Sequence, residues 1–172
     1  MIKTLIDQSF PLVMLEQEQI QNSVYLGDVE KNIEIFNALL KGKKAINELI
    51  PNHFENLNKC CRAISSIIQR DDFQIFSFEN EIRSGFPFLM LNNYPPEDCV
   101  ISNRMNYATE KLTHIEASMA INAMSYCYLC ESTENEIEAE FSAFMLDFIK
   151  ILASHNYETE CFNSSGFYNI ID

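Results

Sequence analysis

Two long segments in the second half of the chain carry apolar residues at helical spacing, and they constrain the fold more than any other feature. The first runs from Ser102, a suitable N-cap, to Tyr128, and the second runs from Thr133 to Leu152. Apolar residues that recur every three to four positions mark one face of a helix. From Ala117 onward the first segment is apolar on its opposite face as well, which is typical of a helix buried on several sides. We therefore expect a helical bundle around this helix.

Each of these two helices has a start signal and an apolar face. Ser102 caps the first helix, and its apolar face comprises Met105, Ala108, Leu112, Ile115, Met119 and Tyr126. Thr133 and Glu136 precede the second helix at the three-residue spacing of a capping box. The apolar face of the second helix comprises Ile137, Phe141, Phe144, Phe148 and Leu152.

The first hundred residues predict shorter elements. Helices are expected over residues 11–21, 28–42, 43–50 and 52–68. Residues 72–83 fit either a helix or a strand. Residues 84–100 are expected to be irregular, because Pro87 and the Pro95–Pro96 pair prevent a regular helix.

Length and composition indicate one folded domain. A chain of 172 residues that is 47% hydrophobic, with four glycines and five prolines, can bury a core without disulfides. We expect an all-α, single-domain multi-helix bundle over residues 1–172, with a small extended element around residues 73–90. The polar tail, residues 157–172, is expected to dock through its aromatic side chains.

The N-terminus lacks the features of a secretory signal, because Asp7 and Pro11 interrupt any apolar stretch. No segment has the roughly 18 to 20 consecutive apolar residues that cross a bilayer. The six cysteines do not form the framework of a secreted disulfide scaffold. We expect a cytoplasmic protein with reduced thiols.

Negative charge is concentrated in the last third of the chain. Residues 112–172 hold ten acids and one base, Lys150, and so carry nine of the 13 net negative charges. Such a field attracts cationic partners and repels nucleic acid and anionic membranes. The candidate partner-binding residues are Glu131, Glu134, Glu136, Glu140, Asp147, Glu158 and Glu160.

The Cys127-Tyr-Leu-Cys130 motif is the strongest candidate for chemistry. Cysteines at positions i and i+3 of a helix share a face, where they could hold half of a zinc site or act as a redox pair. The adjacent Cys60 and Cys61 lack ligand spacing, and the surroundings are apolar, so core packing is the favoured interpretation. No phosphate-binding loop, hydrolase motif or zinc-protease motif occurs. We expect no enzyme activity, cofactor or metal; the alternative is a small metal- or thiol-dependent enzyme that uses Cys127 and Cys130 with His114.

The run from Phe86 to Leu91 is a second candidate contact surface. Its Phe, Met and Leu side chains would make good interface anchors if they were exposed. Large exposed apolar patches are rare on monomers, so burial of this run in the core is favoured.

In general character the chain resembles the immunity proteins encoded beside bacterial polymorphic or contact-dependent-inhibition toxins. It shares with them small size, acidity and the absence of a catalytic motif. The resemblance implies a protein that neutralises a basic partner, a toxin domain such as a nuclease, by covering its active site. A DNA-mimic antagonist of a defence protein is a further alternative, since it would use the same acidic surface. The oligomeric state stays open.

Overall fold

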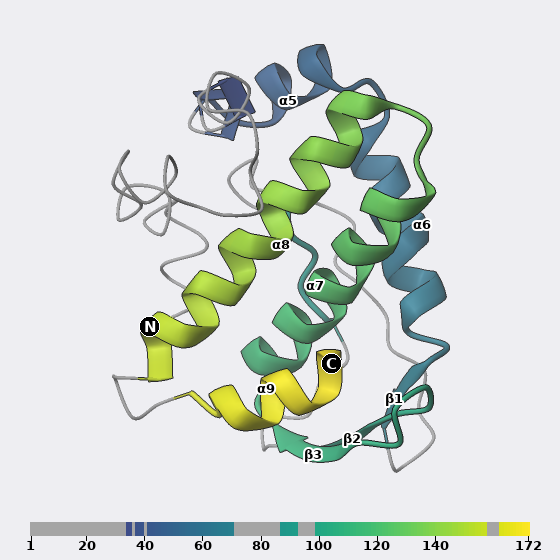
Figure 1. Ribbon diagram of the computed structural model, residues 1–172, viewed down its shortest axis with the longest axis vertical. Coiled ribbons are helices and arrows are strands. Elements are labelled where there is room, and N and C mark those ends of the chain that lie inside the picture. The colour runs from purple at the N-terminus through teal and green to yellow at the C-terminus, as the bar shows by residue number, and fades with distance from the viewer. Residues whose placement is uncertain (1–33, 36, 40, 71–86, 93–98, 158–161) are drawn as a thin grey trace.

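The computed structural model describes residues 34–70 except 36 and 40, together with residues 87–92, 99–157 and 162–172. These residues are mostly helical and include a small antiparallel sheet at one end (Figure 1). The predictions for residues 11–21 and 72–83, and for the start of the helix over residues 28–42, lie outside the described residues.

Helix α7 (His114–Ser132) is the centre of the bundle. It packs against α6 (His53–Ile64), α8 (Glu136–Tyr157) and α9 (Ser164–Ile171) (Figure 1). From Glu116 to Ala123 every residue of α7 is buried. This confirms the expectation of a central helix buried on several sides. The largest fully buried side chains of the core are Tyr126, Phe141, Phe144, Phe148 and Phe167.

The prediction of a helix starting at Ser102 is wrong, and the all-α class is confirmed only in part, because the mostly helical structure includes a small sheet. Strands β1 (Ile68–Arg70), β2 (Cys99–Asn103) and β3 (Thr109–Leu112) form one antiparallel sheet in the order β1-β2-β3. Ser102 pairs with Thr109 across β2 and β3.

The turn between β2 and β3 explains why this stretch is not helical. Asn103 and Asn106 each accept a hydrogen bond from the backbone two residues on, at Met105 and Ala108 respectively, both at 2.8 Å. Such local bonds make asparagine favour turns over helix interiors. Helix α7 begins after Thr113 instead, which forms a capping box with Glu116.

The start of α8 also differs from the prediction. Thr133 is the C-cap of α7, and α8 is capped by Asn135, whose Oδ1 accepts the backbone N–H of Glu138 at 3.1 Å. The pair Asn135 and Glu138 therefore occupies the positions predicted for Thr133 and Glu136. Because the helix start lies two residues later than predicted, the carboxylate of Glu138 points into the bundle.

The first half of the described chain follows the prediction more closely. Helix α5 (Lys43–Leu49) ends before Pro51, as expected. Asn52 occupies the N-cap position of α6, but in a left-handed conformation and without a side-chain cap bond. Ile68, predicted to continue this helix, begins β1.

The segment from Pro87 to Leu91 is extended and lies along α7. Its residues 87–91 are buried, which confirms the core interpretation for that part of the apolar run. The carbonyl of Pro87 accepts from the hydroxyl of Tyr126, both backbone groups of Leu89 bond Asn122, and the N–H of Leu91 bonds Ser118. Four residues of a helix advance by about 6 Å and two residues of a strand by about 6.7 Å, so the two spacings match.

The tail docks on the bundle through α9. Phe162, Phe167 and Ile170 are buried there. Asn163 caps the helix by accepting the N–H of Gly166 at 2.9 Å, and its own N–H bonds Glu116. Because Glu116 also belongs to the capping box of α7, one carboxylate joins the starts of α7 and α9.

Gly42 lies between the helical residues 34–35, 37–39 and 41 and helix α5, and it has φ +90°. A Cβ atom there would have no heavy atom within 4 Å, so only the backbone conformation resists a side chain. We expect Gly42→Ala to lower the free energy of unfolding by about 1 kcal/mol. Urea unfolding followed by circular dichroism measures this change. An unchanged midpoint would contradict the left-handed backbone at Gly42.

Candidate functional site

The predicted acidic residues do not form one exposed stripe. Glu131, Glu134 and Glu136 are exposed where α7 turns into α8, and we call these three residues the acidic corner. Glu140 and Asp147 are half-buried and have interaction partners. Glu158 and Glu160 lie outside the described residues.

The acidic corner lies at the end of the bundle away from the sheet (Figure 1). Within the described part of the chain, no ion pair joins any of its three carboxylates to a base. Glu136 stands in the first turn of α8, where the helix dipole favours negative charge. The corner therefore presents three carboxylates to solvent, and the dipole of α8 favours the charge of Glu136.

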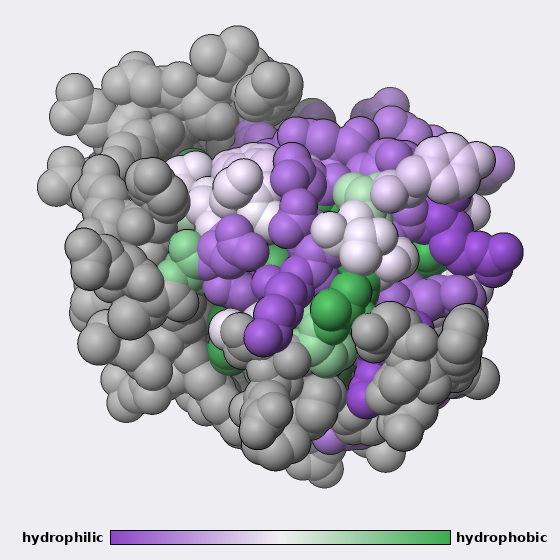
Figure 2. Space-filling view, turned by 90° about the horizontal axis from the view of Figure 1, so that it is seen from below, coloured by the Kyte–Doolittle hydropathy of each residue, from purple (hydrophilic) through white to green (hydrophobic). Residues whose placement is uncertain are grey.

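An apolar groove lies beside this corner. It has a volume of about 410 Å³ and is lined mainly by α7, with contributions from the ends of α6 and α9, the β2–β3 turn and α8. Met105 and Tyr128, which are 69% and 53% exposed, both line it, together with Met124 and Leu146. Glu131 and Lys150 are its charged lining residues. Seen from the end that bears the sheet, the described residues form a mostly hydrophilic surface with small hydrophobic areas (Figure 2).

The thiols give no chemical site among the described residues. Cys127 is exposed in the apolar groove, whereas Cys130 is half-buried, and burial followed by the nearby Cys127 and Glu131 raises the pKa of Cys130. Burial also raises the pKa of Cys61, to about 12. A raised pKa disfavours the thiolate, which is the nucleophile and the metal ligand.

Metal ligation by Cys127, Cys130 and His114 is not supported by their positions. His114 is the first residue of α7, and its Nε2 bonds the carbonyl oxygen of Leu91. Thirteen residues of helix separate it from Cys127, which corresponds to about 20 Å along the axis. Among the described residues, no group of three or more His, Cys, Asp or Glu side chains could hold a metal ion.

A buried polar network, which the sequence analysis missed, joins α6, α7 and α8. His53 is fully buried, and its Nδ1 lies 3.1 Å from Oε1 of Glu138. The same carboxylate accepts from Asn56 at 3.0 Å and from the hydroxyl of Thr133 at 2.9 Å. On its other side His53 stacks on Tyr126, with 5.9 Å between ring centroids and 18° between planes.

The charge of Glu138 is stabilised despite its burial. Burial acts to raise the pKa of this carboxyl, but the hydrogen bonds from His53, Asn56 and Thr133 outweigh it, so the pKa lies below the ordinary value of 4.5. In the sequence, the three-residue spacing of Asn135 and Glu138 was a signal for the N-cap of α8, and this cap is what places Glu138 in the network. Because His53, Tyr126 and Glu138 are buried and only Asn56 and Thr133 are half-buried, we interpret the network as an element of stability.

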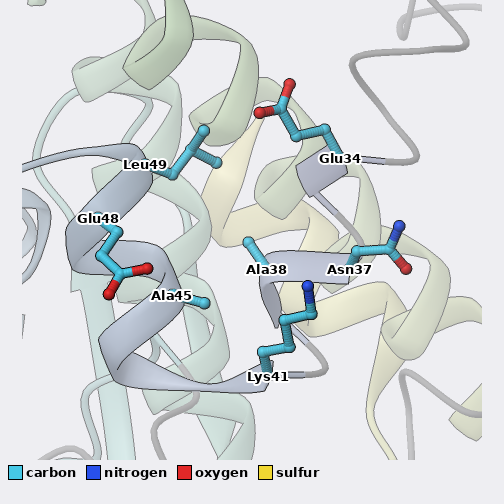
Figure 3. A pocket seen from close by; sticks show the side chains of 7 residues that line it. All are labelled: Glu34, Asn37, Ala38, Lys41, Ala45, Glu48 and Leu49. Atoms are coloured by element: carbon cyan, nitrogen blue, oxygen red, sulfur yellow. The ribbon is translucent and has the colours of Figure 1, made fainter.

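A second cavity, of about 560 Å³, lies between α5 and the helical residues 34, 37, 38 and 41 (Figure 3). Its side chains come from these two short helical segments and include Glu34, Lys41 and Glu48. Among the described lining residues none carries a hydroxyl, thiol or imidazole group. Glutamate and lysine can transfer protons, but three exposed charged side chains do not by themselves define an active site.

Comparisons with known proteins leave the acidic corner and the apolar groove as the main guides to function. No family model, curated protein or solved structure matches this chain. No helix in the described ranges is long and apolar enough to cross a membrane.

Proposed function

We propose that this chain is an acidic binding protein that neutralises a basic protein partner. The single observation that carries the proposal is the acidic corner: three neighbouring exposed carboxylates with no basic partner among the described residues, on a chain of net charge −13. Complementary charge accelerates association and disfavours acidic competitors. The partner is a protein with a basic surface, and the acidic corner lies against it in the complex.

The finer proposal is that the partner is a toxin domain and the chain its immunity protein. A nuclease fits this role, because its active site is basic in order to bind phosphates. An acidic protein held over such a site excludes nucleic acid by both charge and bulk. The raised pKa of Cys130 and the separation of His114 from Cys127 favour this proposal over the enzyme alternative.

The test compares two variants with the same net charge. The corner variant carries Glu131→Lys, Glu134→Lys and Glu136→Lys, and the control carries Glu34→Lys, Glu48→Lys and Asp172→Lys, which replace exposed acids on other elements. We expect the corner variant to lose no more than about 1 kcal/mol of stability, mainly through the dipole of α8. Thermal unfolding checks this.

Binding is measured by immobilising the parent and both variants and passing lysate of the native host over each. The parent and the control are expected to retain a basic protein that elutes as salt rises, and the corner variant is expected to lose it. Equal retention by all three proteins would contradict the role of the acidic corner. Producing the captured protein in cells tests the toxin assignment: harm that the parent relieves supports it, and a harmless protein contradicts it.

A further inference from the structure

The apolar groove exposes side chains that a folded protein normally covers. Met105, Tyr107 and Tyr128 are three of the exposed large hydrophobic residues in the described structure, and Met105 and Tyr128 line the same groove. Single exposed apolar residues are ordinary, but a shared groove that also contains Met124 and Leu146 has the character of an interface centre. Its volume of about 410 Å³ lies within the range of binding pockets.

The β2–β3 turn holds one wall of the groove in a fixed shape. Asn103 donates from Nδ2 to the carbonyl of Ile170 at 2.7 Å, and Asn106 donates to the carbonyl of Asn169 at 2.9 Å. These bonds tie the turn to α9. Tyr107 has φ +61°, a conformation that costs free energy for a residue other than glycine. The exposed Met105 is thus presented on an anchored turn, which reduces the ordering cost of binding.

The negative charge of the chain disfavours a second copy of itself in the groove and favours a basic partner. A second copy of this chain would bring another net charge of −13 and a second acidic corner, so electrostatic repulsion opposes self-association. Glu131 belongs to both the groove and the acidic corner, whereas Lys150, the other charged lining residue, stands on α8 and would repel a base placed beside it. A segment that seats apolar side chains here therefore gains most if a basic side chain stands beside them, opposite Glu131.

We propose that the basic partner anchors itself in the apolar groove through an amphipathic helix. Its bulky apolar side chains fill the space beside Met105, Met124 and Tyr128, and a flanking Lys or Arg pairs with Glu131. This inference rests on the proposed function and assigns the two surfaces different tasks. The acidic corner steers the partner, and the groove supplies most of the affinity, as buried anchors do at protein interfaces.

The first experiment uses a labelled helical peptide of about 15 residues, long enough for helix formation, with Leu at positions i, i+3, i+4 and i+7 and Lys on its other face. Fluorescence anisotropy measures its Kd for the full chain. The groove variant Met105→Asn/Tyr128→Asn is expected to weaken binding about tenfold or more. The matched control Ile137→Asn/Ile151→Asn replaces two exposed apolar residues of α8 outside the groove lining and is expected to bind like the parent.

Charge is tested with a peptide in which Glu replaces every Lys, and with Glu131→Gln. The Glu peptide is expected to bind at least about tenfold more weakly, and Glu131→Gln to weaken the Lys peptide and reduce its salt dependence. Equal loss in the groove variant and its control would overturn the proposal. Light scattering tests the other occupant: a parent dimer that becomes monomeric in the groove variant would make the groove a self-interface and would also overturn it.

The captured partner separates failure of this inference from failure of the proposed function. Loss of the partner from both the corner variant and the groove variant supports both. Loss from the corner variant alone overturns the groove proposal and leaves the proposed function standing. Retention by both variants overturns both. Circular dichroism of each variant checks that it is folded.

Discussion

Replacing Asn122 with leucine is expected to lower the free energy of unfolding by about 3–5 kcal/mol. Asn122 is fully buried on α7, and its side chain bonds both backbone groups of Leu89, at 3.0 Å to the N–H and 2.9 Å to the carbonyl. Leucine has a similar shape but leaves these two groups without their partner inside the core. Each unsatisfied buried group costs about 1–3 kcal/mol.

Urea unfolding monitored by circular dichroism measures the effect. The midpoint should fall while the slope with denaturant stays the same, because the surface exposed on unfolding is similar. Asn169→Leu, an exposed position on α9, is the matched control and is expected to change stability by no more than about 0.5 kcal/mol. If Asn122→Leu unfolds at the parent's midpoint, the extended segment does not depend on this side chain.

Replacing Glu138 with alanine is expected to cost about 2–3 kcal/mol at pH 7. The change removes the acceptor of His53, Asn56 and Thr133 at once. His53 is fully buried and cannot turn to water for a replacement, so its Nδ1 loses its partner. Thermal or urea unfolding at pH 7 measures the loss.

The pH dependence of the same position has a definite sign. The pKa of Glu138 is lowered in the folded protein, below its ordinary value of 4.5. The charged carboxylate therefore contributes stability that is fully present well above pH 4.5 and is lost as the pH falls through the lowered folded value. We expect the parent to lose more stability than Glu138→Gln between pH 6 and the acid range, since glutamine does not titrate. Parallel acid-stability curves for the two proteins would contradict the assignment.

The periodicity of the sequence was sufficient to predict that two long helices exist, but not where each of them begins. Phe141, Phe144 and Phe148 lie on the buried face of α8, and α7 is buried on several sides, as its apolar composition indicates. The buried faces of α7 and α8 depend on residues that are close in sequence, so helical spacing is enough to predict them.

Residues 99–112 were predicted incorrectly because the same apolar residues suit either structure. Leu112 points into the core from β3, as it would have from a helix, so burial alone does not distinguish the two. What makes residues 99–103 a strand is the pairing of β2 with β1, which lies far away in the chain. The asparagines at positions 103 and 106 were the local signal, through their preference for turns.

By itself, the sequence determined a helical core and a strongly acidic last third, because apolar spacing and charge are properties of neighbouring residues. Only the tertiary structure decided which acids reach solvent: Glu131, Glu134 and Glu136 do, whereas Glu138 turns inward to His53, 85 residues away. It also decided that Ser118, Asn122 and Tyr126 face an extended segment instead of solvent. The physical reason is that buried polar groups usually need a hydrogen-bond partner, and Asn122, Tyr126 and Glu138 find theirs in distant parts of the chain.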